Sequence, residues 1–270
     1  RRRAPYLIAL YGVDVWRRLA WDRRRALHGA SVQLAISRTT IERARPFTGV
    51  LEHAMLLHLT LEPDTAEARG IVDRGLLERL GSGYVLIVGR MAATERYKGH
   101  DELLRALPQV LQQQPEARLV IVGDGDDRAR LERAAAELGV STQVVFTGFV
   151  NEATLREVHR RAAIFAMPST GEGFGLVYLE AMREGVPCVA ARDSVAAEVM
   201  IDGESGVLVN AGDPASLGAA LVRLLADSTL RTRIGAAGRE RFESEWSYPR
   251  FAQSLDAALD RLTGASNVRN

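Results

Sequence analysis

A glycine-rich segment from Pro168 to Gly175 is the part of the sequence best suited to bind a charged ligand. It contains Gly171, Gly173 and Gly175, and the apolar run that follows predicts a helix beginning near Gly175. Glycine keeps a Cβ out of the way of a ligand, and the first amides of a helix have no internal partners and lie at the positive end of its dipole. The segment therefore predicts a phosphate or diphosphate site.

Two cationic side chains are expected beside this site. Arg90 directly follows the predicted strand 85–88 and its glycine, and Lys98 comes eight residues later. A third loop, Gly123-Asp124-Gly125-Asp126, follows the next strand, and its aspartates are expected to act as turn residues and helix caps. Ligands of open parallel sheets collect outside the carboxyl ends of the strands, so we expect these loops to share one rim. Arg90 and Lys98 would then neutralise a bound diphosphate.

Glu180 lies within the helix predicted after the glycine-rich segment. Apolar residues surround almost the whole helix, which predicts that it is buried, and a buried carboxylate is costly without partners. Two interpretations stay open. The carboxylate could accept hydrogen bonds from sugar hydroxyls, or it could form a salt bridge with Arg183 or with another basic residue.

Glu172 precedes Glu180 by eight positions, and two carboxylates could indicate the acid and base of a glycosidase. We consider this interpretation second best. Glu172 comes before the helix and Glu180 lies well inside it, so nothing aims both at a single bond. A glycine-rich anion site also suits a diphosphate better than a free glycan.

The elements that must position these residues follow a regular pattern from Tyr84 onward. Short apolar runs predict strands at 85–88, 118–122, 144–147, 164–167 and 187–190, and amphipathic stretches between them predict helices at 100–112, 127–138, 152–161 and 175–184. The fold class is therefore α/β, with a Rossmann-like parallel sheet covered by helices on both faces. The tail from Asp213 to Leu262 is predicted to be helical, with a break at Pro249.

Upstream the pattern is fainter. Strands are expected at 6–11 and 32–36, Ser37 is expected to begin a short helix, and Gly81-Ser82-Gly83 is expected to form a hinge. We predict a partial N-terminal α/β domain at residues 1–83, a ligand-binding domain at 84–245, and a C-terminal helix at 246–270 that returns to the first domain. Because the sequence has no initial Met, we expect the front part of the N-terminal domain to lie upstream of Arg1.

Composition excludes several classes of protein. The chain is 47% hydrophobic and 26% charged with a net charge of +1, which indicates a globular protein and no nucleic-acid partner. A single cysteine, Cys188, excludes an intrachain disulfide and favours a reducing compartment, where it is expected to be a buried strand residue. No apolar run reaches the length of a membrane span. We expect a cytoplasmic protein.

The basic run Arg1–Arg3 is expected to be solvated, and the scattered histidines, His53 and His159 among them, are expected to be structural.

Four ordered motifs resemble those of retaining glycosyltransferases of family 4 (group 1), which have the GT-B fold. The segment from Glu172 to Glu180, continued by Ala181-Met182 and Gly185-Val186-Pro187, resembles the E-x7-E signature of that family. The other three are listed in chain order: Gly89-Arg90 with Lys98-Gly99-His100, 120–125, and 146–150. Phe242 and Trp246 resemble the family's tail. The match upstream is partial, since Tyr11 stands where many members have a His.

The resemblance implies a role for each matching residue. Arg90 and Lys98 would contact the donor diphosphate, and Glu180 the ribose hydroxyls of the nucleotide. Glu172 would reach the transferred sugar, while the amides of the segment comprising Gly173, Phe174, Gly175 and Leu176 would serve the sugar and phosphates. Val150 would meet the base through its backbone. The family needs no metal in the site, and its chemistry retains the anomeric configuration without a protein nucleophile.

The resemblance also implies the partners. The donor would be a nucleotide-diphosphate sugar (a UDP- or GDP-sugar), and the acceptor hydroxyl would belong to a glycan, a lipid or a small molecule. Peripheral contact with the inner face of a membrane, through the N-terminal region, is compatible with this function. Two alternatives stay open: a module that binds nucleotide-sugar without turnover, and a nucleotide-sugar epimerase of the same fold.

Overall fold

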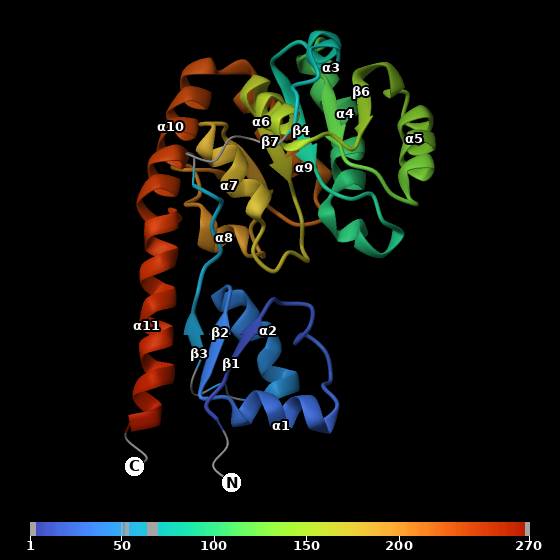
Figure 1. Cartoon of the computed structure of the whole chain (residues 1–270). Coiled ribbons are helices and arrows are strands. Elements are labelled where there is room, and N and C mark those ends of the chain that lie inside the picture. Colours follow the sequence, from blue (N-terminus) through green and yellow to red (C-terminus); the bar gives the residue numbers. More distant parts are fainter. Residues whose placement is uncertain (1–3, 50, 52–53, 64–69, 268–270) are drawn as a thin grey trace. The chain divides into compact units, whose positions relative to one another are not determined.

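The structure, a computed structural model, describes residues 4–49, 51, 54–63 and 70–267. Its internal contacts define two compact units (Figure 1). Unit 1 comprises Arg1–Pro63, Glu172–Leu176 and Glu245–Asn270, and unit 2 comprises Asp64–Gly171 and Val177–Ser244. The domain boundaries expected at residues 83 and 245 stay a prediction. The expected hinge, Gly81-Ser82-Gly83, lies inside unit 2, where the chain bends at Ser82 and Gly83.

Unit 2 is built on a six-stranded, all-parallel sheet with the order β6-β5-β4-β7-β8-β9. Its strands are β4 (Tyr84–Val88), β5 (Leu119–Val122), β6 (Val144–Gly148), β7 (Ala162–Met167), β8 (Cys188–Ala191) and β9 (Val207–Val209). The central strands are nearly continuous apolar runs, and β5 and β8 are buried along their whole length, because helices cover both faces of the sheet (Figure 1). The expected α/β fold class is confirmed.

The helices of unit 2 lie before, between and after these strands. They are α3 (Arg74–Leu80), α4 (His100–Gln113), α5 (Arg128–Glu137), α6 (Glu152–Arg161), α7 (Leu176–Arg183), α8 (Ala196–Val199), α9 (Pro214–Ala226) and α10 (Ser228–Glu245), with short 3-10 helices η1 (Ala93–Lys98) and η2 (Ser141–Gln143). Helix α9 packs on α4 and on β7, β8 and β9, whereas α6 packs on β7 and α3. Leu217, Leu221 and Leu224 of α9 are buried.

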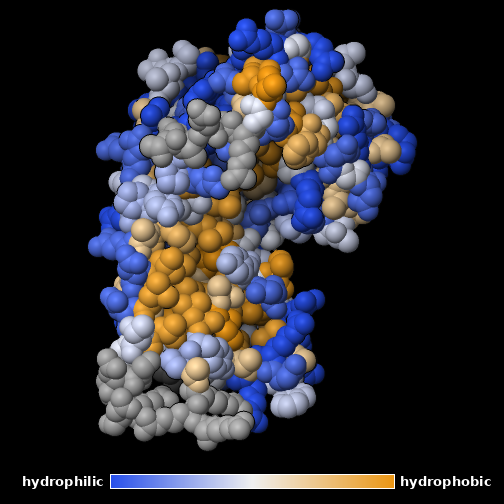
Figure 2. Space-filling view, in the orientation of Figure 1, coloured by the Kyte–Doolittle hydropathy of each residue, from blue (hydrophilic) through white to orange (hydrophobic). Residues whose placement is uncertain are grey.

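Unit 1 contains a smaller parallel sheet of three strands with the order β1-β2-β3. Its elements are β1 (Leu7–Leu10), α1 (Trp21–Gly29), β2 (Val32–Ala35), α2 (Arg38–Thr48), β3 (Ala54–Leu56) and α11 (Tyr248–Asn267). One apolar cluster joins Leu10 and Ala35 to Leu27 of α1 and Ala44 of α2. A second cluster joins β2 to α11 through Ala258, and in Figure 2 apolar side chains gather over these elements of unit 1.

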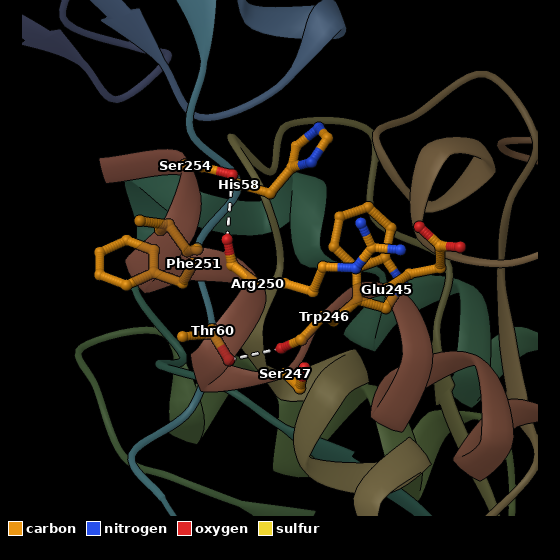
Figure 3. A pocket seen from close by; sticks show the side chains of 9 residues that line it. His58, Thr60, Glu245, Trp246, Ser247, Arg250, Phe251 and Ser254 are labelled. Carbon is orange, nitrogen blue, oxygen red and sulfur yellow. Dashed lines mark hydrogen bonds between the residues drawn. The ribbon is translucent and has the colours of Figure 1, made fainter. Parts of the chain in front are cut away.

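A small cavity of about 140 Å³ lies in unit 1, where the segment after β3 meets the start of α11 (Figure 3). The Thr60 hydroxyl donates a hydrogen bond to the carbonyl of Trp246, and His58 packs edge-on against the Trp246 ring at 4.8 Å between centroids. Arg250 and Ser254 of α11 also line the cavity. None of the residues expected to bind a ligand lines it.

Glycines allow β4 and β5 of unit 2 to end in close contact. A Cβ at Gly123, whose φ is +131°, would lie 2.1 Å from the carbonyl oxygen of Gly89. A Cβ at Gly125 would lie 2.1 Å from the carbonyl oxygen of Met91. The Met91 amide also donates to the Asp124 carbonyl at 3.0 Å. Only glycine fits at these two positions, and the loops after β4 and β5 are therefore held together.

This contact predicts a stability difference between two glycine substitutions. Gly139 also has a positive φ, +69°, but no atom lies within 4 Å of a Cβ placed there. Gly139→Ala should lower the free energy of unfolding by about 1–2 kcal/mol through the strained backbone alone. Gly123→Ala should lower it by about 1–3 kcal/mol more, because overpacking adds to the strain. Urea denaturation measures both, and equal losses would contradict the close contact.

Candidate functional site

The order of the strands in unit 2 indicates where a ligand binds. After β4 the chain adds β5 and then β6 on one side of β4, and it later returns to add β7, β8 and β9 on the other side. The direction in which strands are added therefore reverses between β4 and β7. Crevices at such switch points, outside the carboxyl ends of the strands, are the usual ligand sites of doubly wound sheets. The loop after β4 carries Arg90 and Lys98, and the loop after β7 is the glycine-rich segment.

Within unit 2 these two loops touch one another. The Thr170 amide donates to the carbonyl of Tyr97 at 3.0 Å. Gly99 has a φ of +92°, and a Cβ there would lie 2.6 Å from Pro168. A Cβ at Gly171 would lie 2.5 Å from the ring of Tyr97. The sequence-based expectation that the loops meet at one rim is thus confirmed for β4 and β7.

Arg90 and Lys98 lie together because both approach one carboxylate. Arg90 Nη2 donates to Glu95 Oε1, and Lys98 Nζ lies 3.7 Å from Glu95 Oε2 and 5.4 Å from the centroid of the Tyr97 ring. Arg90 is 76% exposed, whereas the side chains of Glu95 and Lys98 are 16% and 14% exposed. Sequence reasoning missed Glu95, although an acid between two expected cations was a readable signal. Lys98 is also the only lysine in the chain.

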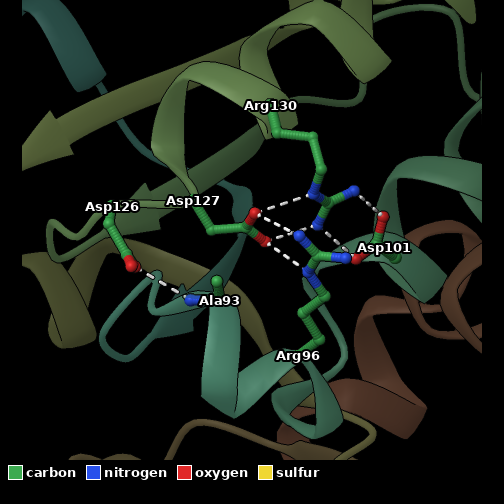
Figure 4. A network of polar contacts seen from close by, with 6 residues as sticks. All are labelled: Ala93, Arg96, Asp101, Asp126, Asp127 and Arg130. Carbon is green, nitrogen blue, oxygen red and sulfur yellow. Dashed lines mark hydrogen bonds and ion pairs between the residues drawn. The ribbon is translucent and has the colours of Figure 1, made fainter.

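A network of charges anchors the 3-10 helix η1 that ends at Lys98 (Figure 4). Arg130 of α5 donates to both oxygens of Asp101 at 2.7 Å, and it also donates to Asp127 at 2.6 Å and 2.9 Å. Arg96 of η1 completes the network with bonds of 2.8 Å and 3.0 Å to Asp127. Hydrogen bonds from Arg130 hold the pKa of both aspartates below the ordinary value.

Asp124 and Asp126 have the structural roles that the sequence predicted. Asp126 Oδ1 accepts a hydrogen bond from the Ala93 amide at 2.9 Å, so it caps the start of η1 (Figure 4). Asp124 Oδ1 accepts from the Gly125 amide at 2.8 Å in the turn after β5. The helix that follows, α5, has no side-chain cap of its own.

The segment before α7 keeps its amides available. Among the described residues, no hydrogen bond is recorded from the amides of Gly173, Phe174 or Gly175. Gly175 has a φ of +83°, and α7 begins at the next residue, Leu176. Within unit 1, the carbonyl of Gly173 accepts a hydrogen bond from the Ser37 hydroxyl at 2.9 Å. The segment is therefore held through its carbonyl side, while its amides remain without a protein acceptor.

Two further residues of the expected site have surroundings that suit a backbone role. The Phe174 side chain is only 3% exposed, and its ring packs against His58 and Trp246 at centroid distances of 6.0 Å and 5.6 Å. It anchors the segment and leaves only its main chain for a ligand. Val150 is half-buried in the loop between β6 and α6, after Phe149, which is 86% exposed. Glu172 is half-buried in its loop.

Glu180 has a basic neighbour that sequence reasoning did not identify. Its Oε2 lies 3.3 Å from Nε2 of His159 on α6, whereas Arg183 contacts Glu184. The expected salt bridge to Arg183 is therefore wrong, and the basic residue whose side chain lies beside the Glu180 carboxylate is His159. The expected burial of α7 is confirmed, because Tyr178, Leu179, Ala181 and Met182 are buried. Cys188 is also buried as expected, at 0% exposed.

His100 begins α4 directly after Lys98 and Gly99, as the sequence predicted, and it is 3% exposed. Burial, with a further contribution from the Lys98 ammonium, lowers the pKa of His100 to about 4. Asp101 and Asp127 oppose this shift and Arg130 adds to it. The neutral imidazole adds no positive charge beside the Lys98 ammonium.

The pKa of His100 predicts a pH dependence of stability. Between pH 6.5 and about 4 the unfolded chain binds a proton at His100 and the folded chain does not, so the free energy of unfolding should fall as the pH falls through this window. His100→Gln removes this contribution. Denaturation of both proteins at several pH values should show a difference that changes between pH 7 and 4, and parallel profiles would contradict the shift.

Some expectations concern metals, membranes or residues outside the described ranges. No group of three or more potential metal ligands occurs among the described residues. Of the helices described, none combines the length and the apolarity that crossing a membrane requires. Arg1–Arg3 and His53 lie outside the described residues.

Comparisons with known proteins agree with this architecture. A family model described as "Glycosyl transferases group 1" matches residues 73–241. A GDP-mannose-dependent alpha-(1-6)-phosphatidylinositol monomannoside mannosyltransferase of Mycolicibacterium smegmatis is 36% identical over 234 residues, which cover 83% of this chain and 61% of that protein. A phosphatidyl-myo-inositol mannosyltransferase of Mycobacterium leprae is 40% identical over 171 residues, covering 63% of this chain and 44% of that protein.

Solved structures of glycosyltransferases share the fold. HepE of Anabaena, crystallised with UDP and glucose, superimposes with a TM-score of 0.80 at 22% identity, covering 95% of this chain and 71% of that one. The lipopolysaccharide glycosyltransferase WaaG superimposes with a TM-score of 0.73 at 22% identity, covering 97% of this chain and 76% of that one. The fold is therefore of the GT-B class.

The chain belongs to the group 1 glycosyltransferase family. It spans less than two thirds of the length of the two mannosyltransferases above. The switch-point loops after β4 and β7, together with α6 and α7, all lie within the segment that the family model matches.

Proposed function

We propose that the protein is a retaining glycosyltransferase of family 4 that transfers a sugar from a nucleotide-diphosphate sugar to an acceptor hydroxyl. The observation that carries this proposal is the meeting of the loops after β4 and β7 at the switch point of the unit 2 sheet, through Thr170 and Tyr97. Membership of the group 1 family supports the same reaction class.

The donor diphosphate is the leaving group, and its developing charge must be stabilised. In this proposal the amides of the segment from Gly173 to Leu176 bind its oxygens, because they lie at the start of α7 and those of Gly173, Phe174 and Gly175 donate to no acceptor in the described part of the chain. Arg90 and Lys98 supply fixed positive charge in place of a metal ion. Glu95, which both cations approach, holds them close together before the donor binds.

The sugar and the nucleoside are assigned to different residues. Glu172 contacts the transferred sugar, Glu180 accepts hydrogen bonds from the ribose hydroxyls, and the backbone of Val150 meets the base. The acceptor oxygen attacks the anomeric carbon on the face that the diphosphate leaves, and the departing phosphate takes the acceptor proton. The anomeric configuration is then retained without a protein nucleophile.

GDP-mannose is the donor that the relatives favour, since the Mycolicibacterium smegmatis protein is named as dependent on it. The same name gives that protein a phosphatidylinositol monomannoside as its acceptor, which favours a lipid acceptor here. A lipid acceptor also favours an enzyme at the cytoplasmic face of a membrane. UDP-sugars remain a donor class to test, because HepE was crystallised with UDP.

Lys98→Ala and Glu180→Ala should each weaken the binding of a nucleoside diphosphate by about 10- to 100-fold, because each removes a charge-assisted contact. Isothermal titration calorimetry with GDP and UDP measures both. Arg239→Ala, at an exposed ion pair on α10, is the matched control and should leave the affinity unchanged. Wild-type affinity in both site variants would exclude this site.

Glu172→Ala should lower turnover by about 100-fold or more while changing nucleoside-diphosphate affinity less than about threefold, because its contact is to the transferred sugar. Initial rates of transfer and calorimetry on the same preparation separate the two effects. Equal losses would contradict the role of Glu172. Binding without any turnover in the wild type would favour the binding module, and conversion of the free donor without acceptor would favour the epimerase.

A further inference from the structure

His159 occupies a buried position in the last turn of α6. The side chain is 2% exposed, and its ring lies 5.6 Å from the ring of Phe165 on β7. Neither ring nitrogen has a hydrogen-bond partner among the described residues, and the polar atom recorded near the ring is Glu180 Oε2, 3.3 Å from Nε2. A histidine with a purely structural role would normally satisfy its ring nitrogens with main-chain or side-chain partners. Nε2 of this imidazole instead lies beside one carboxylate oxygen, with which it forms no hydrogen bond.

Three arginines of α6 and α7 contact a different acid. Arg156 and Arg160 donate to Glu184 at 3.0 Å and 2.7 Å, and Arg183 Nε lies 3.3 Å from Glu184 Oε1. A guanidinium is a fork of five donors that covers both oxygens of a carboxylate, whereas an imidazole presents one N–H on each nitrogen. Glu180 therefore faces a partner that can hold one of its oxygens and leave the other open.

The two oxygens of the Glu180 carboxylate also differ in their exposure to solvent. Oε2, on the side of His159, is buried, although 26% of the side chain is accessible. The accessible part therefore belongs to the other atoms of the side chain, and Oε1 is the oxygen left for a ligand. A carboxylate oxygen accepts hydrogen bonds from hydroxyl groups, which is the contact assigned to Glu180.

We propose that His159 is a positioning residue for the nucleoside half of the donor: its ring, with Nε2 3.3 Å from Glu180 Oε2, confines that oxygen so that Oε1 is oriented to accept the ribose hydroxyls. This inference rests on the proposed function, which assigns the ribose to Glu180. A flexible glutamate loses rotamer freedom when it binds, and a carboxylate held in place beforehand loses less. His159 therefore contributes to affinity through the ribose and not through the phosphates or the base.

The test compares a nucleoside diphosphate (GDP or UDP, whichever the wild type binds more tightly) with its 2′,3′-dideoxy counterpart by calorimetry on the whole chain. The ratio of the two dissociation constants isolates the ribose contact. We expect the wild type to prefer the ribose form by about 10-fold or more. Glu180→Ala should reduce the ratio to about 1, and His159→Leu should reduce it at least about threefold.

Two polar variants provide the matched control. The amide nitrogen of Gln reaches about as far as Nε2 of histidine, and that of Asn reaches only about as far as Nδ1. His159→Gln should therefore keep the wild-type ratio within about twofold, and His159→Asn should behave like His159→Leu. This pair decides the question even if the leucine variant does not fold, and equal ratios in the two polar variants would overturn the inference.

The outcomes also separate this inference from the proposed function. If Glu180→Ala leaves the ratio of the two dissociation constants unchanged, Glu180 does not contact the ribose. His159 then has no positioning role either. If Glu180→Ala abolishes the preference while His159→Leu weakens both ligands equally, the ribose assignment stands. His159 would then be structural, and the positioning role would be overturned.

Discussion

The close approach of the carboxyl ends of neighbouring parallel strands is the constraint on which the rest of unit 2 depends. Gly123 and Gly125 press against the main chain after β4, and Gly99 and Gly171 give room to the loops that meet between β4 and β7. A side chain at any of these positions would separate the loops. Because the strands are parallel and the order reverses at this point, the groups proposed to bind the diphosphate come from loops at the end where the sheet opens.

Charge at this edge is arranged in two layers. An inner network around Asp127, with Arg96 and Arg130, fixes the 3-10 helix that ends at Lys98. A second group, in which Arg90 and Lys98 approach Glu95, combines an exposed Arg90 with a largely buried Lys98. The inner network resists exchange because its donors and acceptors satisfy one another. Arg90 and Lys98 share the Glu95 carboxylate, and a ligand with more negative oxygens can replace it as a partner of both cations.

Much of this architecture was predictable from the sequence, because buried parallel strands are short apolar runs and their helices are amphipathic. The helix expected at 152–161 matches α6, and the one expected at 100–112 differs from α4 by one residue. Helix α1 was missed because charged residues such as Asp22 and Arg23 hide its weak apolar face, and β9 because it is three residues long. The pairing of His159 with Glu180 depends on how α6 and α7 pack across β7, which the spacing in one sequence does not reveal.

The central claim is that a diphosphate binds beside Lys98, and the presence of a single lysine allows a direct measurement. Reductive methylation with 13C-formaldehyde labels Lys98 and the terminal amine, and retains the charge of both. The account predicts that GDP or UDP, and inorganic diphosphate at higher concentration, shift the Lys98 13C NMR signal in a saturable manner, whereas the nucleoside alone does not. A Lys98 signal that stays fixed while calorimetry shows the nucleotide to be bound would contradict the account.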